Sequence, residues 1–219
     1  MITSETVNRG IDYIMRHLDQ EITVEDVADY CHFSKYYYSR FFKEETGESV
    51  YAVIKRMRMN QSAVRLQLEK GKSITEIGLD YGYSSTNYSA VFKLQHQVAP
   101  ARFRKDSADR YFPSPFYEDR RTAFLPFAEY AGMVSIQELE PLTVIDERFI
   151  GNYIELAEQW EPFVEKYAGY RTEETCYIER NFDDPSVARL DRCVYDMCMT
   201  VDGGCSAENI TTVSGGRYA

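Results

Sequence analysis

The sequence predicts two domains of different class, an all-α double helix-turn-helix domain over residues 1–106 and an α+β domain over residues 132–219. Three observations support this prediction. Apolar side chains recur at helical spacing through the first hundred residues, and part of that pattern repeats at an offset of 50 residues. After about residue 132 the pattern changes to short strand-like stretches around one helix. Residues 107–131, which contain three prolines among charges, are predicted to be the linker.

Length, composition and charge exclude several classes of protein. The chain has 219 residues, of which 44% are apolar, so global disorder is excluded. It has no run of about 18 apolar residues and no visible signal peptide, so we expect a cytoplasmic protein with no membrane partner. Residues 31–72 carry nine basic and four acidic residues, whereas residues 107–219 carry 10 basic and 21 acidic. This asymmetry predicts domains with different partners.

The helices of the first domain are predicted from periodicity and end signals. Thr23 and Ser34 are suited to cap the helices that follow them, and Gly47 is suited to end the second of these. One long helix is expected from Val50 to Lys70, ended by Gly71. An earlier helix is indicated by the apolar residues Ile11, Ile14, Met15 and Leu18.

The repeat makes each copy a short helix, a tight turn and a second helix, which is helix-turn-helix geometry. Small residues, Ala28 and Gly78, stand where the two helices of each copy would cross. The residue before each capping serine, Phe33 or Tyr83, is expected to pack on the first core tyrosine of the next helix. The identical pairs are Ser34 and Ser84, Tyr38 and Tyr88, Ser39 and Ser89, Phe42 and Phe92, and Lys43 and Lys93.

The two copies differ at two positions where the backbone conformation is expected to be left-handed. The tight turn has Gly82 in the second copy but His32 in the first, and histidine tolerates a left-handed conformation better than most residues. The helix end marked by Gly47 is Gln97 in the second copy. We expect that difference to cost on the order of 1 kcal/mol or to shift the helix end.

The outward face of the second helix in copy one indicates binding to double-stranded DNA. With Tyr38, Phe41 and Phe42 directed to the core, a tyrosine, a guanidinium and two ammonium groups share one short face, which suits a major groove. The alternative is an ordinary solvated basic face. The exposed residues are Lys35, Tyr36, Ser39, Arg40 and Lys43.

The segment from Ser73 to Arg104 resembles the second helix-turn-helix of the AraC/XylS family of transcription regulators, and the copy before it resembles the first. The resemblance covers roughly residues 5–106. It implies base contacts from Lys35, Tyr36, Ser39 and Arg40, and a contact with RNA polymerase near a promoter. The residues that carry it are Ile74, Ile77, Gly78, Gly82, Tyr83, Tyr88, Phe92, Lys93, Pro100, Phe103 and Arg104.

Copy two has no long donor on its equivalent face, because Ala90 stands where copy one has Arg40. We therefore expect it to act through phosphate contacts and DNA shape. Its face consists of Ser85, Thr86 and Ser89, with Lys93 behind. Candidate phosphate contacts elsewhere, each of which could be ordinary surface, are Lys55, Arg56, Arg58, Arg65, Arg102, Arg104 and Lys105.

The α+β domain is predicted from five strand-like stretches and an amphipathic helix over Tyr153–Tyr167. Residues 132–219 resemble the beginning of a GyrI-like effector-binding domain, which appears truncated after one of its two units. The resemblance implies a small hydrophobic or cationic effector. Tyr153, Trp160, Tyr177 and Tyr195 could line its cleft or simply form core. The strands are expected at residues 134–136, 142–149, 176–178, 192–201 and 210–213.

The remaining sequence features say less about function. No catalytic residue, cofactor motif or metal ligand set is recognised, and Asp183–Asp184 and Glu173–Glu174 are expected to be solvated loop residues. The favoured interpretation is a DNA-binding transcription regulator that is not an enzyme. The alternative is a ligand-binding or hydrolytic GyrI-like protein for which DNA binding is secondary.

Overall fold

The computed structural model describes residues 4–109, 132–133, 135–184, 187–207 and 209–218. The chain divides into two compact units. Unit one contains the described residues up to 109 together with Arg148–Tyr153 and Asn181–Tyr195, and unit two contains the rest. The expected linker and its aromatic residues lie almost wholly outside the described residues. None of the helices in the described part of the chain combines the length and apolar character that a membrane crossing requires.

Seven helices form most of unit one, and the expected end signals account for their bounds. Thr23 and Ser34 cap α2 and α3 as predicted, and Gly47 ends α3 in the left-handed conformation at φ 75°. The long helix α4 ends two residues before the predicted position. The bounds are α1 Glu5–Arg16, α2 Val24–Tyr30, α3 Lys35–Thr46, α4 Val50–Leu68, α5 Ile74–Asp80, α6 Ser85–His96 and α7 Pro100–Asp109.

The core of unit one is built from the inward faces of these helices. Tyr38 and Phe42 of α3 are fully buried, as are their repeat partners Tyr88 and Phe92 of α6. Burial raises the pKa of Tyr88 to about 12, and its hydroxyl is hydrogen-bonded to Ser62 Oγ at 3.0 Å. Gly78 is required at the crossing of α5 and α6, because a Cβ there would lie 2.7 Å from Tyr88 Cγ.

Two segments from the second half of the chain belong to unit one through buried polar contacts. Arg148, which is 2% exposed, places Nη2 2.8 Å from Asp12 Oδ1 on α1. Asp183, 7% exposed, accepts a hydrogen bond from Asn60 Nδ2 on α4 at 2.9 Å and another from the Val194 amide at 3.2 Å. The expectation that Asp183 is solvated was therefore wrong, because α4 supplies an amide partner far away in sequence.

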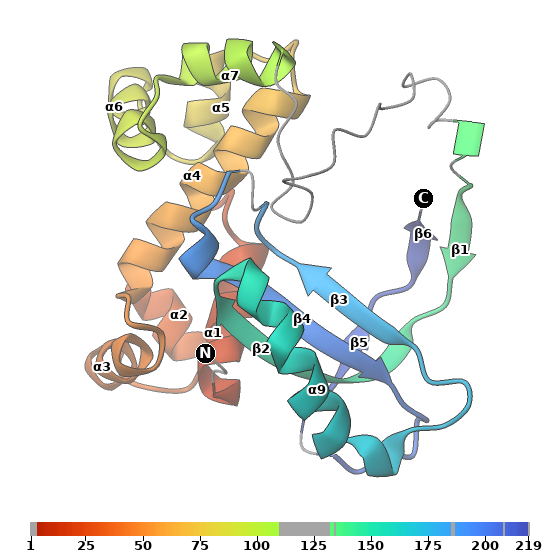
Figure 1. Cartoon of the computed structure of the whole chain (residues 1–219). Helices are drawn as coiled ribbons and strands as arrows, with labels where there is room; N and C mark the ends of the chain where they lie inside the picture. Colours follow the sequence, from red (N-terminus) through yellow and green to blue (C-terminus); the bar gives the residue numbers. More distant parts are fainter. Residues whose placement is uncertain (1–3, 110–131, 134, 185–186, 208, 219) are drawn as a thin grey trace. The chain divides into compact units, whose positions relative to one another are not determined.

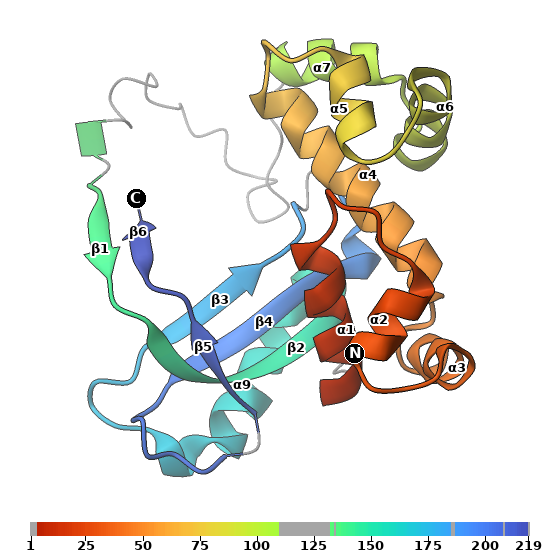
Figure 2. The same ribbon diagram turned by 180° about the vertical axis from the view of Figure 1, so that it is seen from behind.

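The strands form a four-stranded sheet of order β3-β4-β2-β5 and a separate pair, β1 with β6. The β2–β5 pair is antiparallel, with Leu142 opposite Val213. One helix, α9, lies over one face of the four-stranded sheet (Figures 1 and 2). The bounds are β1 Gln137–Leu139, β2 Leu142–Gly151, α9 Leu156–Lys166, β3 Tyr177–Asn181, β4 Cys193–Thr200, β5 Ile210–Val213 and β6 Gly216–Tyr218, and short 3-10 turns span Tyr153–Glu155, Ala168–Tyr170 and Leu190–Arg192.

Unit two is held by charged groups on the strands. Arg180 on β3 lies between two carboxylates, 2.7 Å from Asp196 Oδ2 on β4 and 3.3 Å from Asp146 Oδ2 on β2. Glu147 accepts hydrogen bonds from Lys166 and Tyr167 at the end of the α9 region. These ion pairs and hydrogen bonds offset the free-energy cost of burying polar side chains.

Two local predictions need correction. The strand expected at residues 134–136 does not begin there: residue 134 lies outside the described residues, Ser135 and Ile136 are not in a strand, and β1 begins at Gln137. In copy one Phe33 stacks on Tyr37, with ring centroids 5.4 Å apart, rather than on the core tyrosine. The matching contact in copy two, Tyr83 with Tyr88, forms at 6.3 Å as predicted.

Candidate DNA interface

The two helix-turn-helix copies share backbone hydrogen bonds of the tight turn at an offset of 50 residues. In the first turn the Phe33 amide donates to the Ala28 carbonyl at 3.0 Å, and in the second the Tyr83 amide donates to the Gly78 carbonyl at 3.0 Å. The turn residues His32 and Gly82 are both left-handed, at φ 65° and 77°. Histidine therefore adopts the conformation that the turn requires, as predicted.

The equivalence extends to the helix ends. Thr23 with Asp26 and Ser73 with Glu76 form reciprocal capping boxes on α2 and α5. The helix ends Gly47 and Gln97 are both left-handed, at φ 75° and 59°. Gln97 thus ends α6 at the position equivalent to Gly47, and the predicted shift of the helix end does not occur. The repeat therefore fixes two copies of one backbone motif.

The long helix α4 sets the spacing between the copies. It has 19 residues, which corresponds to about 28 Å at 1.5 Å per residue. Figures 1 and 2 both show α3 beside the first end of α4, whereas α6 contacts its middle, where the Gln95 amide donates to the Arg56 carbonyl and the Tyr88 hydroxyl to Ser62 Oγ. Since α4 is a single uninterrupted helix within unit one, the two second helices are carried on a rigid spacer.

The outward face of α3 presents the predicted residues of copy one. Tyr36 is 80% exposed, and the Lys35 and Arg40 side chains are 54% and 61% exposed. Ser39 is half-buried and Lys43 is exposed. This face therefore offers an aromatic ring and three cationic groups to a partner.

Acidic partners hold two of these cations in the free protein. Lys35 Nζ lies 2.6 Å from Glu25 Oε1 on α2, and Arg40 Nε lies 3.8 Å from Glu44 Oε1 one turn along α3. The Arg40 guanidinium also lies 5.9 Å from the centroid of the Tyr37 ring. Sequence reasoning missed these three partners. The i,i+4 spacing of Arg40 and Glu44 was a usable signal, whereas Glu25 is brought to Lys35 only by the turn.

The outward face of α6 is exposed but carries short side chains. Ser85, Thr86, Ser89 and Lys93 are all exposed, as is Ala90 at the position of Arg40. Hydroxyl groups of this length can reach a phosphate or a base edge only at close approach. The structure thus brings the predicted copy-two residues to one helix face with little reach.

The remaining predicted cations divide into accessible and engaged groups. The Arg102 side chain is 76% exposed, with Nε 3.4 Å from Asp106 Oδ2, and Lys55 is half-buried. The Arg56 side chain is only 11% exposed and is held by Glu48, with Nη2 3.0 Å from Oε2. Three more arginines are half-buried. Arg58 donates to the Leu18 and Gln20 carbonyls, and Arg65 is paired with Glu69 and Asp80. Arg104 packs into unit one.

Comparison with known proteins identifies the motif. A helix-turn-helix domain family model matches residues 27–106. The Transposon Tn10 TetD protein of Escherichia coli is 35% identical over 95 residues, which are 43% of this chain and 68% of TetD. The regulatory protein PocR of Salmonella typhimurium is 33% identical over 108 residues, 49% of this chain and 35% of PocR.

The chain belongs to the AraC-type helix-turn-helix family of transcription regulators. The right origin-binding protein of Escherichia coli is a further relative, 36% identical over 90 residues, 41% of this chain and 31% of that protein. The match thus spans about two thirds of TetD but only about a third of the other two relatives.

Solved structures also resemble part of this AraC-type protein. The C-terminal domain of AraT, a response regulator from Geobacillus stearothermophilus, is 30% identical, covers 54% of this chain and 95% of its own, and has a TM-score of 0.45. An AraC-type regulator from Chromobacterium violaceum is 22% identical, covers 48% and 95%, and has a TM-score of 0.46. At these TM-scores the likeness adds nothing to the sequence matches.

The four aromatic residues suggested for an effector form two pairs rather than one cluster. In unit one Tyr195 is fully buried, with its ring centroid 4.7 Å from that of Tyr153. In unit two the half-buried Trp160 meets Tyr177, 41% exposed, edge to face at 6.1 Å. Of the two pairs, Trp160 with Tyr177 is the more exposed.

Proposed function

We propose that a single molecule of this AraC-type regulator binds one DNA duplex, with α3 and α6 entering successive major grooves on the same face. The single observation that carries the proposal is the duplication of the motif about a rigid spacer helix, α4. Successive major grooves lie about 34–36 Å apart along the duplex, and α3 and α6 are both carried by one continuous helix about 28 Å long. The site is therefore asymmetric and covers roughly two turns.

In this proposal copy one reads the bases. Lys35, Tyr36, Ser39 and Arg40 contact base edges, because Lys35, Tyr36 and Arg40 are exposed and include the long donors that a major groove accepts. Copy two uses Ser85, Thr86 and Ser89 for close backbone contacts. The phosphates are held by Lys43, Lys93, Lys55 and Arg102, whereas Arg56 and Arg104 contribute only if they leave their present surroundings.

Hydroxyl-radical footprinting, together with a measurement of how many chains the DNA complex contains, tests the proposal. We expect protection on one duplex face over about two turns, in a complex that contains one chain. A palindromic footprint that requires two chains would contradict it. A regulatory role is supported by relatives such as the regulatory protein PocR, and contact with RNA polymerase near a promoter in the cytoplasm is a further part of the proposal.

We further propose that residues 132–219 are the first unit of a GyrI-like effector-binding domain. The order β2, α9, β3, β4 is the β-α-β-β order that the resemblance implies, and β5 then pairs with β2. A hydrophobic cation would stack on Trp160 and Tyr177. Since Trp160 is the chain's single tryptophan, its fluorescence reports binding directly. Saturable quenching by tetraphenylphosphonium, lost in Tyr177→Ala, is the expected result, and unsaturable quenching in both proteins would contradict it.

A further inference from the structure

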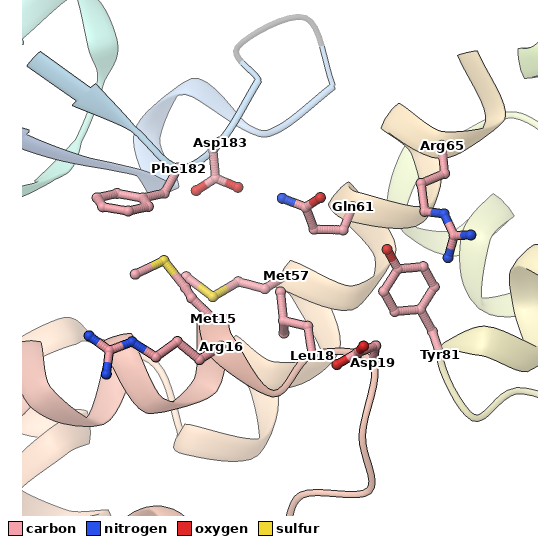
Figure 3. A pocket seen from close by; sticks show the side chains of 10 residues that line it. All are labelled: Met15, Arg16, Leu18, Asp19, Met57, Gln61, Arg65, Tyr81, Phe182 and Asp183. Carbon is pink, nitrogen blue, oxygen red and sulfur yellow. The ribbon is translucent and has the colours of Figure 1, made fainter. Parts of the chain in front are cut away.

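A cavity of about 480 Å³ lies within unit one, a volume in the range of small-molecule sites (Figure 3). Its walls come from four places in the chain: Met15 on α1, Met57 and Gln61 on α4, Tyr81 directly after α5, and the segment Phe182–Asp183. Asp19, exposed to solvent, lies at its rim. A ligand here would touch α1, the spacer helix α4 and the turn of copy two.

One side of the cavity is apolar and suited to an aromatic ring. Figure 3 shows the thioethers of Met15 and Met57 side by side, with the Phe182 ring next to them. Leu18 adds an aliphatic group on the same side. Methionine sulfur makes favourable contacts with aromatic rings at about 5 Å, and its flexible chain adapts to the shape of a guest. This wall therefore favours a flat aromatic body over a sugar or phosphate.

Beside the Phe182 ring the cavity carries a buried carboxylate. Asp183 is 7% exposed, and each of its oxygens accepts one hydrogen bond, Oδ1 from Asn60 and Oδ2 from the Val194 amide. The nearest cation is Arg56, with Nη1 4.0 Å from Oδ2. A carboxylate has about four acceptor positions, so Asp183 retains acceptor capacity toward the cavity, where Figure 3 shows it.

An uncommitted amide lies beside this carboxylate. Gln61 is half-buried and makes no hydrogen bond within the part of the chain that the structure describes. The two arginines that line the cavity are directed away from Asp183: Arg65 is paired with Glu69 and Asp80, and the Arg16 guanidinium lies on the far side (Figure 3). Asp183 therefore offers acceptor capacity to a cation, and the Gln61 amide can accept through its carbonyl oxygen or donate through its N–H groups.

We infer that this cavity is a binding site for a small aromatic primary amine. The ring lies against Met15, Met57 and Phe182, and the ammonium group donates to Asp183. The Gln61 carbonyl oxygen accepts a second ammonium hydrogen. A regulatory meaning, in which the ligand changes how the two copies are held on DNA, rests on the proposed function; the binding itself does not.

The test is calorimetric titration of the intact chain, without DNA, with tryptamine and with tryptophol, its uncharged counterpart. The expected result is binding of tryptamine at least tenfold tighter than tryptophol, because only the ammonium group uses Asp183. Absence of tryptamine binding, or equal affinities for the two compounds, would overturn the inference. Because DNA is absent, failure here leaves the proposed DNA binding untouched.

Variants locate the site and separate charge from packing. Asp183→Asn should remove the tenfold preference for tryptamine while leaving tryptophol affinity unchanged, whereas a general loss of structure would weaken both. Gln61→Leu, which removes no existing hydrogen bond, should weaken tryptamine binding several-fold. It is the variant that tests the site if Asp183→Asn does not fold. Met57→Ala should weaken both compounds equally. Trp160→Leu removes the aromatic site proposed in unit two, so loss of tryptamine binding in this variant would locate the binding there and overturn the assignment.

Discussion

Copy one and copy two share a backbone but differ in the side chains they offer to a partner. Their turns, capping boxes and left-handed helix ends coincide at an offset of 50 residues. Copy one presents Tyr36 and Arg40, whereas copy two presents Thr86 and Ala90 at those positions. The fold is thus duplicated while the chemistry is not, so sequence readout is expected to be concentrated in one half of the site.

The largest expected effect comes from removing the long donor of copy one. Arg40→Ala should cost about 1–3 kcal/mol of DNA-binding free energy and relax base preference in one half of the site. Competition binding against substituted duplexes measures both quantities. The control is Ala90→Gly at the equivalent position, which should change base preference little. An unchanged affinity of Arg40→Ala for the preferred site would show that α3 does not read bases through this face.

Acid should weaken copy two more than copy one. His96 is half-buried on α6, and desolvation lowers its pKa, whereas copy one has the uncharged Thr46 at that position. As the pH falls, the unfolded chain is protonated first, so the stability due to neutral His96 is complete above the unfolded pKa of about 6.5 and is lost below it. Urea denaturation at pH 7.5 and 5.5 should show a loss of up to about 1.4 kcal/mol that His96→Gln removes. An equal loss in His96→Gln would assign the effect to other groups.

Where the copies carry the same residue, they should behave alike. Lys43 and Lys93 are both exposed near the ends of their helices. Lys43→Ala and Lys93→Ala should each weaken binding to all sequences alike and reduce the slope of log affinity against log salt by about 0.9. Salt titrations on specific and random duplexes provide the measurement. If only one variant changes the slope, only one copy contacts the backbone there.

The smallest effect concerns an ion pair that copy two lacks, since Thr75 and Ser85 replace Glu25 and Lys35. Glu25→Gln frees the Lys35 ammonium from its partner at 2.6 Å. Because exposed ion pairs contribute about 0–1 kcal/mol, DNA affinity should rise by no more than a few-fold at low salt and by less at high salt. Thr75→Ala is the matched control. A fall in affinity would show that Glu25 positions Lys35 for DNA.

The helices of unit one were predictable because the sequence signals that define them are local. Capping residues, a repeat and apolar spacing fixed α2 to α6 to within two residues, and the exposed face of α3 follows from the burial of Tyr38 and Phe42. Contacts distant in sequence could not be foreseen. Asp183 looks like a loop carboxylate until Asn60 is brought to it, and the cavity beside it forms only where α1, α4 and that loop meet. For the same reason, Arg56 and Arg58 seemed free on a helix but are held by neighbouring acceptors.

The most direct test of the asymmetry between the copies is selection of binding sites from random duplexes, repeated with Arg40→Ala. The account predicts an asymmetric consensus spanning about two turns, in which one half has strong base preferences and the other has weak ones. Arg40→Ala should erase preferences only in the strong half. Equal preferences in both halves, or a loss in the weak half, would contradict the assignment of base readout to copy one.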